Sequence, residues 1–132
     1  MGFTYSILSN KDERVISIKD KTILGLYEHV IIKGKKIPAR IDSGAVRSSI
    51  DIDLAKELGI NNIIGSKKIR NVHGSNLRPL VHANVTLCKK RLKTDFTLQL
   101  RSHMKFKILI GQNILTKDFI IDPKKTILQR IK

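Results

Sequence analysis

The stretch RIDSGAVRSSI, residues 40–50, places a carboxylate directly after an apolar run and before small residues. Ser43 and Gly44 permit a sharp turn, with Gly44 free to take a positive φ, so the Asp42 carboxylate can point into a cleft while neighbouring amides donate to it. An aspartate that acts as a general acid or base needs this geometry. The same letters also form ordinary turns, so both a catalytic acid and a plain turn remain open.

A second stretch, ILIGQNIL at residues 108–115, reads as an apolar strand, a glycine and a short helix. Together, apolar-Asp-Ser-Gly-Ala and Ile-Leu-Ile-Gly-x-x-Ile-Leu resemble the two halves of the retropepsin-like aspartic proteases. The resemblance implies that Asp42, Ser43 and Gly44 form the catalytic turn. It also implies that a scaffold packs behind this turn, made of Ile110, Gly111 and Asn113.

Four ordered blocks are similar to one cellular branch of that family, labelled "ATP-dependent zinc protease": residues 24–50, 72–81, 100–115 and 119–128. Members of this branch are often linked with an ATP-grasp ligase that adds glutamates to a ribosomal protein, and trimming of such tails is attributed to some. The label itself finds no support in the sequence, which lacks a Gly-x4-Gly-Lys-Ser/Thr loop and a His-Glu-x-x-His pair. We therefore expect no cofactor and no metal, since the histidines and Cys88 match no familiar ligand spacing.

Two positions depart from the viral members of the family. Gln112 stands where retropepsins usually carry an arginine that braces the dimer by ion pairs, so the bracing must differ here. Ser43 replaces the usual threonine and keeps the hydroxyl that bonds across the active site. Neither departure removes the carboxylate.

Pepsin-type chemistry requires two carboxylates close enough to share one proton. The sequence holds a single Asp-x-Gly, at Asp42, and the other candidates lack a turn that would present them: Asp51, Asp53, Asp95, Asp118 and Asp122. The second carboxylate must then come from Asp42 of another subunit. We expect a twofold symmetric homodimer with the active site on its axis.

A hairpin around Val72, His73, Gly74 and Ser75 lies between the two motifs and has turn-forming residues at its tip. We expect it to close over the cleft as a flap. A plain surface hairpin is the alternative. Arg70 and Arg78 flank this tip, and Arg47 follows the catalytic turn. Positive charge at the rim would favour an acidic peptide or protein. The candidate substrate-binding residues are Ala45, Arg47, Arg70, His73, Gly74, Ser75 and Arg78.

Net charge widens the list of partners. The chain has 26 Lys and Arg against 11 Asp and Glu, a formal charge of +15. This potential attracts polyanions and fits proximity to RNA or the ribosome as well as an acidic substrate, although a generally basic proteome would produce it too. The rival hypothesis is a non-catalytic retropepsin-like module that binds RNA, a ribosomal protein or an acidic tail.

The length of 132 residues fits one domain, which we place at residues 22–132 behind an N-terminal extension of residues 1–21. The single cysteine excludes an intrachain disulfide, no apolar stretch could span a bilayer, and the N-terminus shows no signal-peptide pattern. We therefore expect a cytoplasmic protein that does not bind membranes.

Hydrophobic patterning predicts an all-β chain, a small closed acid-protease barrel with one or two short helices. Hairpins are expected from residues 22–32 with 37–41, and from 67–72 with 77–87 around the turn HGSN. Val81, Ala83, Val85 and Leu87 should be buried, as should Phe96, Leu98 and Leu100. Residues 53–59 predict a helix with Asp53 as N-cap and Gly59 as its stop, QNILTK predicts a helical turn, and FIID and TILQRI predict strands.

Overall fold

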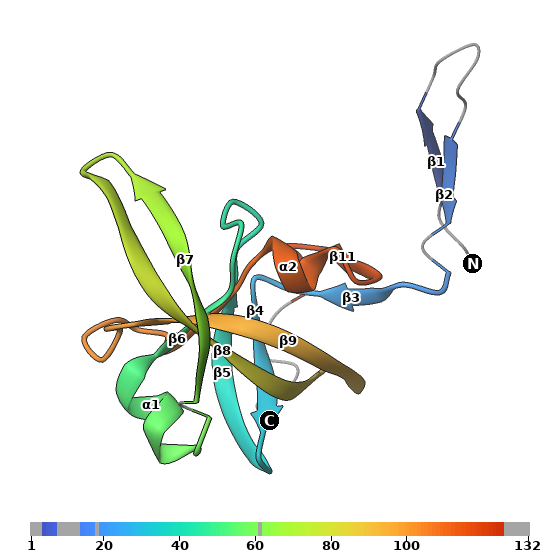
Figure 1. Cartoon of the computed structure of the whole chain (residues 1–132). Coiled ribbons are helices and arrows are strands. Elements are labelled where there is room, and N and C mark those ends of the chain that lie inside the picture. Colours follow the sequence, from blue (N-terminus) through green and yellow to red (C-terminus); the bar gives the residue numbers. More distant parts are fainter. Residues whose placement is uncertain (1–3, 8–13, 18, 61, 126–132) are drawn as a thin grey trace.

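The computed structural model describes residues 4–7, 14–17, 19–60 and 62–125. Strands dominate this part of the chain, and two short helices interrupt them (Figure 1). The elements are β1 Thr4–Ile7, β2 Arg14–Ser17, β3 Thr22–Leu24, β4 Tyr27–Ile32, β5 Lys35–Ile41, β6 Ser49–Asp51, α1 Ile52–Glu57, β7 Ile63–Asn71, β8 Gly74–Leu87, β9 Lys90–Gln99, β10 Ile108–Ile110, α2 Gln112–Leu115 and β11 Phe119–Ile121. The predicted all-β character and the short helices are confirmed, whereas the TILQRI strand lies outside the described residues.

The largest sheet has the strand order β4-β5-β10-β6-β9-β8-β7. β4 also pairs with β8, through Val30 with Leu87 and Ile31 with Thr86. The first strand of this order is therefore also hydrogen-bonded to the next-to-last strand. β10 lies between β5, to which it is parallel, and β6, to which it is antiparallel. The end of β5 and the start of α2 are thereby brought together, although they are far apart in the sequence. β1 and β2 form a separate two-stranded sheet, and β3 pairs with β11.

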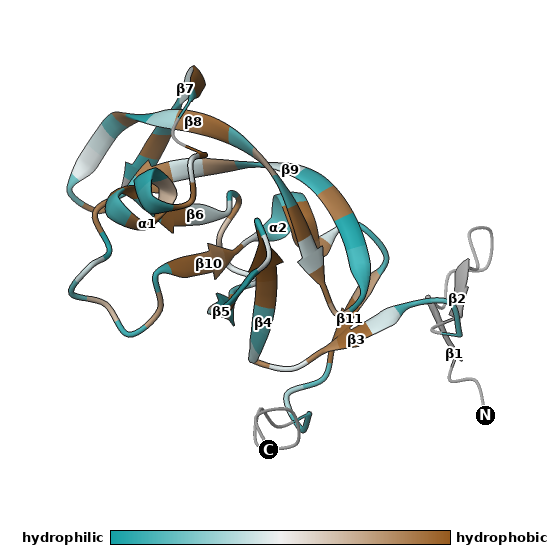
Figure 2. Ribbon diagram, turned by 90° about the horizontal axis from the view of Figure 1, so that it is seen from below, coloured by the Kyte–Doolittle hydropathy of each residue, from teal (hydrophilic) through white to brown (hydrophobic). Residues whose placement is uncertain are grey.

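β10 consists of Ile108, Leu109 and Ile110 and is apolar along its length (Figure 2). Ile108 and Ile110 are fully buried, as expected for a strand enclosed by partners on both edges. The alternation predicted for β8 is confirmed, with buried residues at 81, 83, 85 and 87. None of the described helices is long and apolar enough to cross a membrane.

The pattern predicted for β9 is only partly correct. Phe96 and Leu98 are buried, but Leu100 is 59% exposed, and Thr97 between them is also buried. Both helices contact β9, and the Thr97 hydroxyl donates to the Ser48 carbonyl at 3.4 Å, so the middle of this strand is covered. Leu100 lies beyond the end of the strand and outside this cover.

Two predicted boundaries shift for local reasons. The N-cap of α1 is Asp51 rather than Asp53, because the Asp51 carboxylate accepts a hydrogen bond from the Leu54 amide at 3.2 Å. Gly59 follows the helix with φ +72°, as expected for a glycine stop. In the β7–β8 hairpin the turn is Val72–His73, and Gly74 and Ser75 already pair within β8. The predicted HGSN turn is therefore displaced toward the N-terminus.

Candidate active site

Asp42 follows β5 directly and is fixed by its own turn. Its amide donates to the Ile110 carbonyl at 2.9 Å, and its carbonyl accepts from the Ala45 amide at 3.2 Å. Its Oδ1 accepts from the Gly44 amide at 2.9 Å. The half-buried carboxylate is thus oriented by the backbone that follows it.

Gly44 is important for a reason other than the one predicted. It does not belong to the glycines with positive φ, which in the described residues are Gly34, Gly59 and Gly74. A Cβ atom at position 44 would lie 3.3 Å from Oδ1 of Asp42. The absent side chain therefore leaves room for the carboxylate to approach the Gly44 amide, and the expected left-handed conformation is wrong.

The segment 110–113 supports this turn from behind. The Gln112 amide donates to the Ala45 carbonyl at 2.7 Å, and the Asn113 amide donates to the Val46 carbonyl at 3.2 Å. The Gln112 side chain donates through Nε2 to the Ser43 carbonyl at 2.8 Å. The neutral amide of Gln112 therefore holds the turn that follows Asp42.

A second layer of hydrogen bonds centres on Ser48, which is fully buried. Its Oγ accepts from the Gly111 amide at 2.9 Å and donates to Oδ1 of Asn113 at 2.8 Å, and its amide donates to the same Oδ1 at 2.8 Å. Nδ2 of Asn113 donates to Oγ1 of Thr94 and to the Asp95 carbonyl. Ser48 was missed at the sequence level, because serine after a predicted turn is ordinarily exposed.

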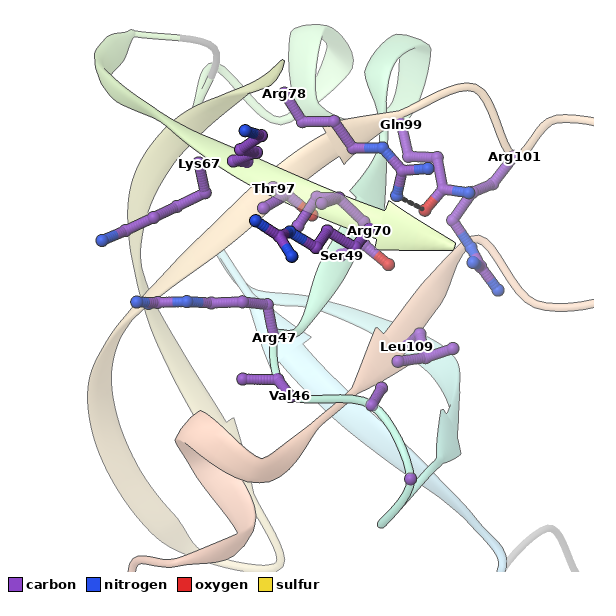
Figure 3. Close-up of a pocket in the computed structure, with 14 residues that line it drawn as sticks. Val46, Arg47, Ser49, Lys67, Arg70, Arg78, Thr97, Gln99, Arg101 and Leu109 are labelled. Carbon is purple, nitrogen blue, oxygen red and sulfur yellow. Dashed lines mark hydrogen bonds between the residues drawn. The ribbon is translucent and has the colours of Figure 1, made fainter. Parts of the chain in front are cut away.

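A cavity of about 670 Å³ opens beside the turn, between residues 44–47 and the β7–β8 hairpin (Figure 3). Its cationic lining residues come from four segments of the chain, and no Asp or Glu is among the described residues that line it. The cations are Arg47, Lys67, Lys68, Arg70, Arg78 and Arg101. Arg78 donates to Oε1 of Gln99 at 3.0 Å, the bond drawn in Figure 3.

The structure brings some of the proposed site residues together and separates others. Gly44, Ala45, Arg47, Arg70 and Arg78 line the cavity. Asp42 and Ser43 lie at the adjoining turn and are not part of the lining. His73, Gly74 and Ser75 lie at or next to the hairpin tip, outside the lining residues.

Nine lining residues were not predicted, and three of them are cations: Lys67, Lys68 and Arg101. The sequence signal for the lysines was the basic run SKKIR, which was counted only toward net charge. Arg101 gave a weaker signal, a lone cation directly after a strand of alternating apolar residues. The pairing of β7 with β8 and of β8 with β9 is what aligns these positions.

The other aspartates of the described core are engaged elsewhere. Asp51 is fully buried and caps α1, while Asp53 lies in the first turn of that helix. Asp95 pairs with His82 at 2.8 Å and Asp118 pairs with Lys21 at 2.8 Å. Within the described residues, no group of three or more His, Cys, Asp or Glu side chains could hold a metal ion.

A family model described as "RimB-like: Retropepsin-like aspartic endopeptidase RimB" matches residues 53–132. The match contains the scaffold residues and the β7–β8 hairpin and begins after Asp42. Its description names neither ATP nor zinc, so the label of the cellular branch is not supported. No curated protein matches the chain.

Solved structures share the fold at low sequence identity. A Legionella pneumophila protein of unknown function is 18% identical with a TM-score of 0.56, covering 80% of this chain and 95% of that one. The simian foamy virus (mac) protease is 18% identical with a TM-score of 0.53, covering 68% and 91%. A foamy viral protease-reverse transcriptase, solved with an RNA/DNA hybrid, is 18% identical with a TM-score of 0.55, covering 69% of this chain and 11% of that longer one. The predicted retropepsin-like fold is confirmed.

Proposed function

Because the chain belongs to the RimB-like family of retropepsin-like aspartic endopeptidases, we propose that it is an aspartic peptidase. Its reactive groups are two Asp42 carboxylates, one from each subunit of a homodimer. The observation that carries the proposal is the placement of Asp42, which follows β5, is oriented by the Gly44 amide and lies beside a large cavity. Other aspartates have partners elsewhere: Asp51 caps α1, Asp95 contacts His82, Asp118 pairs with Lys21, and Asp122 accepts from the Lys124 amide.

The reaction follows from two carboxylates that share one proton. The ionised Asp42 takes a proton from a water molecule as the water oxygen bonds to the peptide carbonyl carbon. The protonated Asp42 of the second subunit gives its proton to the carbonyl oxygen. The product of these two proton transfers is a tetrahedral diol. Collapse of the diol breaks the carbon–nitrogen bond, the leaving nitrogen receives a proton, and the two carboxylates again share one proton.

Acidic peptide tails rich in glutamate are the substrate that we propose. Six cationic residues line the cavity beside the catalytic turn, and the whole chain carries a formal charge of +15. Opposite charge raises both the local concentration of an acidic substrate and its rate of association. The β7–β8 hairpin, with Val72 94% exposed at its tip, is the segment that would close over a bound peptide. A cytoplasmic location is part of the proposal and rests on sequence alone.

The deciding experiment replaces Asp42 with Asn. The amide cannot take a proton from water, so Asp42→Asn should abolish cleavage of a glutamate-tailed peptide while leaving the fold intact. Asp53→Asn, on the exposed surface of α1, is the matched control and should cleave normally. Light scattering at the assay concentration should give about twice the 15.0 kDa chain mass. Full activity of Asp42→Asn, or a strictly monomeric active protein, would refute the proposal.

The alternative is a binding module of the same fold that holds RNA, a ribosomal protein or an acidic tail without cutting it. The net charge favours it as much as it favours the peptidase. This alternative predicts tight RNA binding that falls steeply with salt and is unchanged by Asp42→Asn, together with no cleavage by the unmodified chain. The peptidase proposal predicts the opposite result in the cleavage assay.

A further inference from the structure

Arg101 differs from the other cations of the cavity because it is buried. The residue is 5% exposed and lies two positions beyond the end of β9. Its amide donates to Oδ1 of Asp51 at 2.8 Å, and its Nε donates to the Phe106 carbonyl at 3.0 Å. These bonds fix both the backbone and the first nitrogen of the guanidinium.

The two terminal nitrogens of this guanidinium have no hydrogen-bond partner among the described residues. Figure 3 shows the side chain near Leu109, on the side of the cavity opposite the outstretched side chains of Arg47 and Lys67. A buried charge is normally paired, because removal from water is costly without a partner. Nη1 and Nη2 of Arg101 are therefore donors of a buried guanidinium that no described residue satisfies.

The surroundings of Arg101 make its charge harder to hold. Burial lowers the pKa of the guanidinium, the positive charges of Arg40 and Arg78 lower it too, and Asp51 and Asp42 act in the opposite direction. An arginine nevertheless stays protonated in a protein. A bound anion would relieve the repulsion from Arg40 and Arg78 and satisfy the free donors at the same time.

The other cations of the cavity are less restrained. Lys67, Lys68 and Arg70 are exposed on β7, and Arg47 and Arg78 are half-buried. Exposed charges attract an anion over a distance, but salt screens them and their side chains are mobile. They can increase association without choosing which substrate position must be acidic.

We propose that Arg101 is the specificity-determining residue of this cavity, and that its Nη1 and Nη2 bind one side-chain carboxylate of the substrate in a two-pronged hydrogen bond. This inference rests on the proposed function and adds to it. The fixed position of Arg101 near the catalytic turn requires an acidic residue at one defined position from the scissile bond. A substrate with the same net charge but a glutamine at that position is a poor ligand.

The test measures binding in the full chain carrying Asp42→Asn, so that no peptide is cut. A short glutamate-rich peptide is titrated alongside variants in which each glutamate in turn is replaced by glutamine. One replacement should raise Kd ~10–100-fold, the range expected for loss of a charge-assisted hydrogen-bond pair, and the others by about threefold or less. The large effect should persist at high salt, whereas the small ones shrink.

Arg101→Gln should remove this single-position preference, so that all glutamine variants bind with similar Kd values. Arg101→Lys should also lose most of it, because an ammonium group lacks the planar fork. Arg91→Gln makes the same change at an exposed position of β9, outside the cavity, and should keep the preference. Thermal denaturation checks that each variant folds. If Arg101→Gln does not fold, Arg101→Lys and the peptide series on the Asp42→Asn chain decide the question.

Three results would overturn the inference: Kd values that follow net peptide charge with no special position, a preference that survives Arg101→Gln, or one that Arg101→Lys keeps in full. The two proposals can fail separately. If the unmodified chain cuts no peptide, the peptidase proposal fails, yet the binding series still decides the role of Arg101. If cleavage occurs but no position is special, only the role of Arg101 is rejected.

Discussion

Replacement of Gly111 by alanine should both destabilise the protein and slow cleavage. A Cβ atom at this position would lie 2.6 Å from the Arg47 carbonyl oxygen, 2.7 Å from its carbon and 2.8 Å from the Ala45 carbonyl oxygen. These contacts are to backbone, so no side chain can rotate away. The loop 45–47 would have to move as a unit, and Asp42 lies at the start of the same turn.

The expected cost has two parts. Overpacking of a dense site costs ~1–3 kcal/mol. The shift also weakens the hydrogen bonds from the Gln112 amide to the Ala45 carbonyl and from the Gly111 amide to Oγ of Ser48, each worth about 1 kcal/mol. A loss of about 3 kcal/mol should lower the urea midpoint by ~1.5 M for a slope of roughly 2 kcal/mol/M. Displacement of the catalytic turn by about 1 Å should reduce the cleavage rate by ~100-fold.

Gly65→Ala is the matched control. Gly65 lies in β7, and a Cβ atom there would meet nothing within 4 Å. The free energy of unfolding of this variant should change by less than ~0.5 kcal/mol. Both variants are unfolded at the same protein concentration, because dimer stability depends on concentration. Equal midpoints and equal cleavage rates for the two variants would show that the close approach at Gly111 does not hold the turn.

Two further predictions concern titrating groups away from the cavity. The hydrogen bond and charge of Lys21, with the charge of Lys90, lower the pKa of Asp118. This pairing therefore stabilises the folded state above the ordinary carboxyl pKa, and the stabilisation is lost as pH falls through the lowered pKa. An NMR titration should show that the pKa of Asp118 rises in Lys21→Gln, and an unchanged pKa would contradict the pairing. Burial and the negative charge of Glu28 raise the pKa of the Cys88 thiol, so iodoacetamide should alkylate it several-fold more slowly than a cysteine peptide at pH 8. Equal rates in the folded chain would contradict this environment.

The features that the sequence predicts well are those controlled by neighbours along the chain. The alternation in β8 and the glycine stop at Gly59 depend on adjacent residues, and both are confirmed. The N-cap at Asp51 was missed because both Asp51 and Asp53 precede the apolar residues of the helix pattern. Which of them caps the helix depends on where β6 ends. Leu100 was misplaced because burial in β9 comes from the helices that pack over it.

The site itself depends on contacts that no local pattern reports. The bonds of Ser48 to Asn113 and of Gln112 to Ser43 join residues 65 and 69 positions apart. Likewise, Arg101 becomes a candidate substrate-binding residue only because the fold buries it and leaves two of its nitrogens without a partner among the described residues. The resemblance indicated the Asp-Ser-Gly turn and its scaffold, but the composition of the cavity required three-dimensional positions.

The placement of β10 between β5 and β6 explains why such a short loop can hold the Asp42 carboxylate in one orientation. The Asp42 amide is bonded to Ile110 in front, and the loop that follows is bonded to Gln112 and Asn113 behind. Each bond alone is weak, but all of them depend on one strand register, so the turn cannot relax without separating β10 from a neighbour. The buried β10 strand resists that separation, since Ile108 and Ile110 would both meet water. The energy that keeps Asp42 in position therefore comes from the apolar core of the sheet, and the polar bonds of the site only determine its direction.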